Sequence, residues 1–200
     1  RDFCLSRGLG DVYKRQIMGN SGIGVPLPEL AAYCREAAAE GAVLLKNEGH
    51  MLPVKKDETV SIFGRSQIEY YRSGTGSGGA VNVPYVKNIL DGIKENNVFP
   101  VNEELVEIYQ EWLKEHPFDN GGGGWAAEPW HQAEMEITDE IARRAAEKSE
   151  KAIFLIGRTA GEDKDYEDTE GSYLLTKREK ENLRIVTKYF DEVAVLLNVS

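Results

Sequence analysis

The sequence has few of the residues that supply cross-links or metal ligands. Its 200 residues include only two cysteines, Cys4 and Cys34, and three histidines, at positions 50, 116 and 131. Two cysteines form neither a disulfide framework nor a zinc pattern, and the histidines share no metal-ligand spacing. The sequence therefore implies no metal and no organic cofactor.

Long apolar runs and an excess of positive charge are also missing. No apolar stretch approaches the roughly 20 residues that span a bilayer. Asp and Glu outnumber Lys and Arg by 34 to 24, which gives a net charge of −10. This charge repels phosphate backbones and anionic membrane surfaces. We expect neither nucleic acid nor a membrane as a partner, and since no signal peptide is visible, a cytoplasmic location is favoured.

The two ends of the chain differ from its middle. Residues 1–16 have no helical or strand period and no core-forming run, and Asp11 to Gln16 resembles a translated sequencing adapter, so we exclude them as a non-native segment. Residues 17–28 form a lead-in rich in glycine and proline. Residues 29–200 then form one domain, which we expect to be cut at its C-terminal end because it stops just after an apolar run.

Three short apolar runs, at 59–63, 152–156 and 193–197, read as strands, and the run at 152–156, which has no polar alternation, as one buried on both faces of a sheet. Helical spacing of apolar residues separates them, at 86–96 and in segments that begin after Asn102, at Ile137 and after Thr176. An earlier helix is predicted at 29–47, the alternative being a helix to Glu40 and a strand at 42–46. Alternating strands and helices predict an α/β fold, a three-layer αβα sandwich with a mainly parallel sheet.

Two loops follow the carboxyl ends of predicted strands. The glycine loop, residues 73–79, has glycine at positions 74, 76, 78 and 79. The acidic loop, residues 157–171, contains Glu162 among many other carboxylates. Because right-handed crossovers place such loops on the same rim of a parallel sheet, we expect both to face one site.

Glu162 is the candidate acid of this site. A crowd of like charges makes it costly to ionise one more carboxyl group, so the loop is expected to raise its pKa, opposed by Arg158 and Lys164. The alternative is that the acidic loop is only a solvated connection.

Two predictions are open for Trp125 and Trp130, which lie in the irregular segment 117–136. They either stack on a sugar ring or anchor a surface loop.

Other site chemistries fit less well. The glycine loop lacks the Lys-Ser/Thr pair of a phosphate-binding P-loop. Asp163, Asp165 and Asp168 lack the glycine that a calcium-binding EF-hand loop requires. No serine or cysteine pairs convincingly with a histidine as a nucleophile.

Several motifs in order resemble the αβα sandwich domain of β-glucosidases in glycoside hydrolase family 3. They are Glu36-Ala-Ala-Ala-Glu-Gly-Ala-Val-Leu-Leu-Lys-Asn-Glu48, Phe63-Gly-Arg-Ser-Gln-Ile-Glu-Tyr-Tyr-Arg-Ser-Gly-Thr-Gly-Ser-Gly-Gly79, Leu90-Asp-Gly-Ile-Lys94 and Gly157-Arg-Thr-Ala-Gly-Glu-Asp-Lys-Asp165. The resemblance covers about 29–200.

The resemblance implies a retaining glycosidase that acts on small oligosaccharides or β-glucosides. It assigns the general acid/base to Glu162 and a sugar hydrogen bond to Ser77. A (β/α)₈ barrel domain in cis would supply the nucleophile. No barrel sequence is present, so the isolated chain is expected to be inactive. A non-catalytic sugar-binding or structural domain is the alternative, with a nucleotide-binding module the more distant one.

Overall fold

The computed structural model describes residues 28–77, 79 and 85–199. The predictions for residues 1–16 and 17–27 lie outside this part. The chain divides into two units, and the smaller contains, among described residues, 28–46 and Tyr85. Its helix α2 spans Pro28–Glu40. The helix predicted to reach residue 47 is therefore wrong, and the alternative end at Glu40 is correct, because the chain turns at Gly41, a residue that disfavours helix. The strand that this alternative placed at 42–46 does not form.

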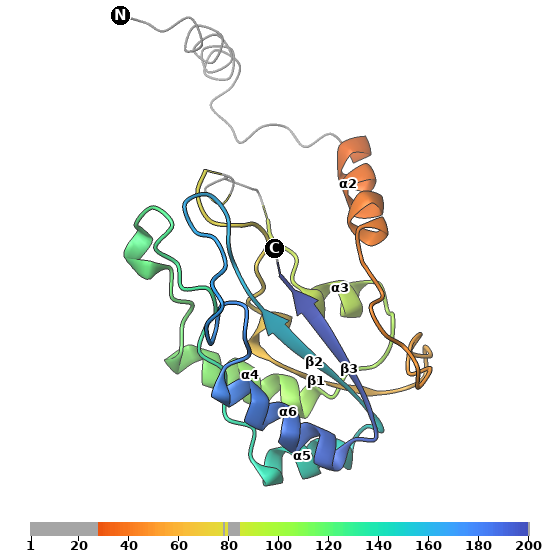
Figure 1. Ribbon diagram of the computed structural model, residues 1–200. Helices are drawn as coiled ribbons and strands as arrows, with labels where there is room; N and C mark the ends of the chain where they lie inside the picture. Colours follow the sequence, from red (N-terminus) through yellow and green to blue (C-terminus); the bar gives the residue numbers. More distant parts are fainter. Residues whose placement is uncertain (1–27, 78, 80–84, 200) are drawn as a thin grey trace, which may run out of the picture. The chain divides into compact units, whose positions relative to one another are not determined.

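The larger unit is built on a parallel sheet of three strands in the order β1-β2-β3 (Figure 1). They are β1 (Val60–Phe63), β2 (Lys151–Gly157) and β3 (Glu192–Asn198). Every residue of β1 and β2 is buried, as expected of parallel strands that are covered on both faces. In β3, by contrast, Val195, Leu196 and Leu197 are exposed.

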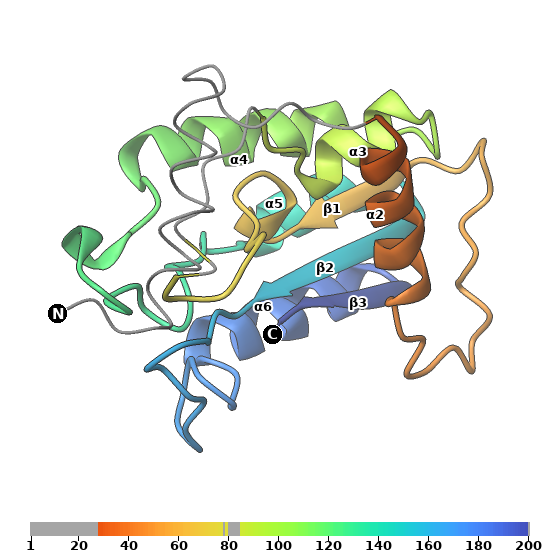
Figure 2. The same cartoon turned by 90° about the horizontal axis from the view of Figure 1, so that it is seen from above.

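Helices cover both faces of this sheet (Figures 1 and 2). On one face lies α3 (Ile89–Glu95), whose Leu90 packs in a cluster with Ile62 and Leu155. On the other face lie α4 (Glu103–Glu115), α5 (Asp139–Ala146) and α6 (Lys177–Tyr189), which bury Phe63 and Phe154. Helices on both faces of a parallel sheet confirm the predicted α/β class and its layers.

The predicted helix starts after Asn102 and Thr176 are correct, because each depends on a local capping side chain. Helices α3 and α5 begin at Ile89 and Asp139, later than the predicted starts at 86 and 137. The side chain of Asn102 accepts a hydrogen bond from the backbone N–H of Leu105 at the start of α4. At the start of α6, Thr176 and Glu179 exchange side-chain to backbone hydrogen bonds as a capping box. None of the helices in the described residues is both long and apolar enough to cross a membrane.

Candidate active site

The glycine loop and the acidic loop meet at the carboxyl end of the sheet, as predicted. The backbone N–H of Thr75 donates to the carbonyl of Ala160 at 3.0 Å, and Thr75 pairs with Gly161 in an isolated parallel bridge. A Cβ atom at Gly161 would lie 2.7 Å from backbone atoms of Thr75. Glycine at position 161 is thus what allows the two loops to approach this closely.

Glu162 and Ser77, the two residues singled out in the sequence, are in direct contact. The backbone N–H of Ser77 donates to Glu162 Oε2 at 3.0 Å, and the Ser77 hydroxyl donates to the same oxygen at 2.7 Å. Thr75 Oγ1 donates to the Glu162 carbonyl at 3.3 Å. The segment 75–77 therefore holds both the backbone and the carboxyl group of Glu162.

Gly76 allows this contact. It has a φ of 85°, and a Cβ atom there would lie 2.4 Å from Glu162 Cβ and 2.8 Å from Oε2. Any side chain at position 76 would therefore collide with Glu162 as well as adopt a left-handed conformation.

The expected rise in the pKa of Glu162 does not occur in this structure. The two hydrogen bonds from Ser77 stabilise the carboxylate and lower its pKa below the usual range, against a small opposing effect of burial. The sequence argument was wrong because the neighbouring carboxylates make no contribution to the pKa of Glu162. Its other oxygen, Oε1, accepts no hydrogen bond from the described residues.

Arg158 makes no contribution to the pKa of Glu162 either. It is 4% exposed, and it forms a bidentate ion pair with Glu179 in which both N···O distances are 2.7 Å. Burial raises the pKa of Glu179, but the hydrogen bonds and charge of Arg158, together with the Thr176 N–H, more than offset it, so the pKa is lowered. The predicted effect of Arg158 on the pKa of Glu162 is therefore absent, because its guanidinium pairs with Glu179 instead.

The tryptophan loop, residues 117–136, is hydrogen-bonded to the acidic loop. Trp125 Nε1 donates to Asp163 Oδ2 at 2.7 Å, and Trp130 Nε1 donates to the Asp165 carbonyl at 3.0 Å. Lys164 Nζ hydrogen-bonds the Glu128 carbonyl and lies 5.3 Å from the centre of the Trp130 ring. These contacts support the anchoring alternative for both tryptophans.

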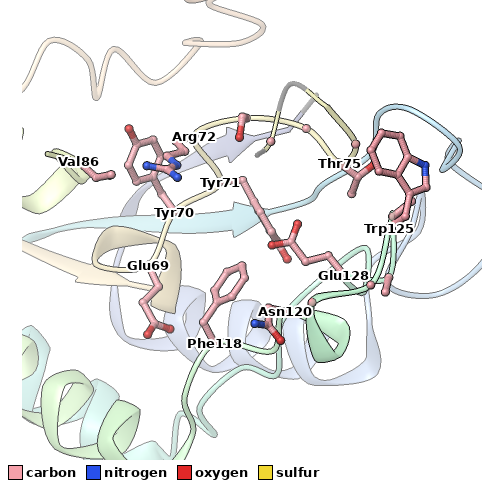
Figure 3. A pocket seen from close by; sticks show the side chains of 18 of the residues that line it. Glu69, Tyr70, Tyr71, Arg72, Thr75, Val86, Phe118, Asn120, Trp125 and Glu128 are labelled. Carbon is pink, nitrogen blue, oxygen red and sulfur yellow. The ribbon is translucent and has the colours of Figure 1, made fainter. Parts of the chain in front are cut away.

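A pocket of about 580 Å³ opens between the glycine loop and the tryptophan loop (Figure 3). Tyr70, Phe118 and Trp125 supply its aromatic walls, and the Glu128 side chain points toward Tyr71. Burial raises the pKa of Glu128, with Lys164 opposing it. Sequence reasoning missed this pocket, because its aromatic residues come from segments without a regular period.

No group of three or more potential metal ligands occurs among the described residues. His131 Nδ1 instead contacts the Gly171 carbonyl at 3.0 Å, and His116 stacks on Trp112. In this part of the chain the candidate chemistry is that of a carboxyl group and its hydrogen-bond partners.

Residues 42–200 match the sequence family described as the glycosyl hydrolase family 3 C-terminal domain. A β-glucosidase of Ruminococcus albus is 50% identical over 164 residues, which are 82% of this chain and 17% of that protein. β-Glucosidase A of Butyrivibrio fibrisolvens is 30% identical over 187 residues, 82% of this chain and 22% of that protein.

Solved structures agree with these matches. A β-glucosidase from Paenibacillus barengoltzii aligns with a TM-score of 0.86 and 65% identity, over 90% of this chain and 19% of its own. β-Glucosidase 3B from Thermotoga neapolitana in complex with glucose aligns with a TM-score of 0.73 and 30% identity, over 86% of this chain and 25% of its own. The chain thus spans a quarter or less of the length of these relatives.

Proposed function

The chain belongs to glycosyl hydrolase family 3, as the C-terminal domain found in β-glucosidases, and we propose that it contributes the general acid/base to a retaining β-glucosidase. In this proposal the acid/base is Glu162. The substrate is a small oligosaccharide or β-glucoside, and the nucleophile comes from a (β/α)₈ barrel domain in cis.

The observation that carries the proposal is the way Glu162 is presented. Its side chain stands at the carboxyl end of the sheet, where open α/β folds bind ligands. The carboxyl group is held through Oε2 by Ser77, while Oε1 has no partner among the described residues. A carboxyl group that is fixed at one oxygen and open at the other suits proton exchange with a substrate.

The two steps of the reaction use Glu162 in opposite senses. It first gives a proton to the departing glycosidic oxygen while the nucleophile bonds to the sugar carbon. It then takes a proton from the water that releases the sugar from the nucleophile.

The first step requires a protonated Glu162, whereas hydrogen bonds from Ser77 favour the ionised form. In a retaining glycosidase the second carboxyl group lies roughly 5 to 5.5 Å away. Its negative charge, together with exclusion of water by the bound sugar, would raise the pKa of Glu162. The proposal therefore assigns this rise to the partner domain and substrate, not to the acidic loop.

Ser77 is proposed to contact the sugar as well. A hydroxyl group has one donor and two acceptor sites. Since its proton is directed to Glu162 Oε2, Ser77 Oγ remains able to accept a hydrogen bond from a sugar hydroxyl.

The test uses a chimera in which this chain replaces the matching segment of the 65% identical β-glucosidase. Glu162→Ala is compared with the parent chimera on an activated aryl glucoside and on cellobiose, whose leaving group needs protonation. We expect the larger loss of kcat/KM on cellobiose, and partial rescue by azide on the aryl glucoside, because azide attacks the glycosyl enzyme without general base help.

An equal loss on both substrates, or no loss, would contradict the acid/base assignment. Unchanged turnover would instead favour a non-catalytic sugar-binding or structural role for this domain. Glu170→Ala, another exposed glutamate of the acidic loop, is the matched control and should retain parental activity on both substrates.

A further inference from the structure

We propose that Ser77 is a positioning residue that distinguishes the two oxygens of Glu162, so that Oε2 stays a hydrogen-bond acceptor and Oε1 exchanges the proton with substrate and water. The inference rests on the proposed role of Glu162. It goes beyond that role by naming the reacting atom and the residue that selects it.

The geometry at Oε2 carries the inference. Two donors of one residue converge on this oxygen, the Ser77 N–H at 3.0 Å and its hydroxyl at 2.7 Å. Donors directed at an oxygen disfavour a proton on that oxygen, because the proton would compete with them for its lone pairs. A proton on Glu162 would therefore reside on Oε1.

The backbone around Ser77 is fixed in a way that maintains this geometry. Thr75 is bound to the acidic loop twice: its backbone N–H donates to the Ala160 carbonyl and its side-chain hydroxyl donates to the Glu162 carbonyl. Gly76 then makes the turn that brings the Ser77 N–H to Glu162. The donors are thus oriented by the contact between the loops before any substrate binds, as preorganisation requires.

Charged groups nearby are directed elsewhere. In the acidic loop, Asp163 accepts from Trp125 and Lys164 donates to the tryptophan loop. Among the described residues, the lowered pKa of Glu162 comes from Ser77 alone, with no contribution from any charged side chain. A substitution of Ser77 that removes a donor should therefore change the pKa of Glu162.

Oε1 can be the reacting atom in both steps of the reaction. In the first step the Oε1–H bond breaks, its proton passes to the glycosidic oxygen, and the carbon–oxygen bond to the leaving group breaks as the nucleophile's oxygen bonds to that carbon. In the second step water bonds to the carbon, its proton passes to Oε1, and the bond to the nucleophile breaks. Glu162 is protonated again at the end, with Oε2 hydrogen-bonded to Ser77 throughout.

The first experiment needs only the 200-residue chain. The carboxyl carbon of Glu162 is titrated by NMR in the parent and in Ser77→Ala, Ser77→Thr and Ser73→Ala. We expect the pKa of Glu162 to rise in Ser77→Ala, which loses the hydroxyl donor. It should stay at the parental value in Ser77→Thr, which keeps both donors, and in Ser73→Ala, the matched control in the same loop. A pKa that is the same in Ser77→Ala and the parent would overturn the inference.

The second experiment measures kcat/KM against pH for the same variants in the chimera, with cellobiose. Because the general acid must be protonated, its pKa sets the alkaline limb. We expect this limb to move to higher pH in Ser77→Ala and to return in Ser77→Thr. A raised KM with an unmoved limb would leave Ser77 only a sugar contact and would overturn the inference.

The two variants separate the acid/base role of Glu162 from the positioning role of Ser77. If Glu162→Ala loses activity on cellobiose while Ser77→Ala leaves the limb unmoved, the acid/base role stands and the positioning role is wrong. If Glu162→Ala keeps full activity, the acid/base role is wrong and the positioning role falls with it, whatever the NMR titration shows.

Discussion

Arg158 ties the base of the acidic loop to the start of helix α6 through its ion pair with Glu179. The guanidinium also donates to the carbonyls of Gly157 and Ser172 at 2.8 and 2.9 Å. Glu179 in turn accepts from the Thr176 N–H, so it caps α6 while it pairs with Arg158. One buried pair thus connects strand β2, both ends of the acidic loop and a helix N-terminus.

Removing the charge of Glu179 should destabilise the chain strongly. Glu179→Gln leaves the Arg158 guanidinium buried without a counter-charge, and such a loss typically costs about 3 to 5 kcal/mol. The measurement is the free energy of unfolding in urea. Glu181→Gln on the same helix, which breaks an exposed pair with Arg184, serves as the control and should cost less than about 1 kcal/mol.

The pH dependence of this pair has a definite sign. The folded-state pKa of Glu179 is lowered, so its contribution is present above the unfolded-state pKa and is lost as pH falls through the folded-state value. The difference in stability between the parent and Glu179→Gln should therefore shrink in acid. A difference that is constant with pH would contradict the assignment.

Glu134 should make stability depend on pH with the opposite sign to Glu179. Both oxygens of its carboxyl group accept from the backbone N–H of Arg65 at 3.2 Å. Burial raises the pKa of this carboxyl group to about 8, although the residue as a whole is only half-buried. An acid with a raised folded-state pKa binds more protons when folded, so stability falls as pH rises from about 4.5 to about 8.

Glu134→Gln removes this loss, since the amide is neutral at every pH and can still accept from Arg65. We expect the variant to gain on the parent by about 1.4 kcal/mol for each pH unit inside the window. Urea unfolding at pH 5 and pH 8 measures the gain. Glu136→Gln, an exposed neighbour, is the control, and an equal effect of both substitutions at the two pH values would refute the prediction.

The anchoring of the tryptophan loop predicts a change in local protection. Trp125→Phe keeps an aromatic ring but loses the N–H that binds Asp163. Because Asp163 has a left-handed φ of 60°, the hydrogen bond helps to hold an unfavourable backbone conformation. We expect faster amide hydrogen exchange at residues 162–165, with little change in global stability because Trp125 is exposed. Exchange rates equal to those of the parent would show that the loop is held by other contacts.

Local pattern was enough to predict the strands, the caps at Asn102 and Thr176 and the meeting of the two loops. Each depends on nearby residues or on the handedness of parallel connections. The protonation of Glu162 was not predictable, because it depends on which side chains face it. The acidic loop turns Asp163 toward a tryptophan, and a serine distant in sequence supplies the donors. The burial of Glu134 likewise comes from packing between segments distant in sequence.

Gly76→Ala tests whether close contact of the loops sets the state of Glu162. The new Cβ atom would lie 2.4 Å from Glu162 Cβ, on a residue whose φ of 85° disfavours any side chain. The glutamate must move away, and the donors of Ser77 then lose Oε2. We expect a cost of about 1 to 2 kcal/mol in unfolding free energy from the left-handed backbone, and a pKa of Glu162 that rises as in Ser77→Ala.

Gly92→Ala is the matched control, because Gly92 lies inside helix α3 and an added Cβ would meet nothing within 4 Å. It should stabilise the chain by about 0.5 to 1 kcal/mol, since alanine loses less backbone entropy on helix formation than glycine. NMR titration of Glu162 and urea unfolding are measured on both variants. If Gly76→Ala left the titration of Glu162 at the parental value, the carboxyl group would not depend on the turn at position 76.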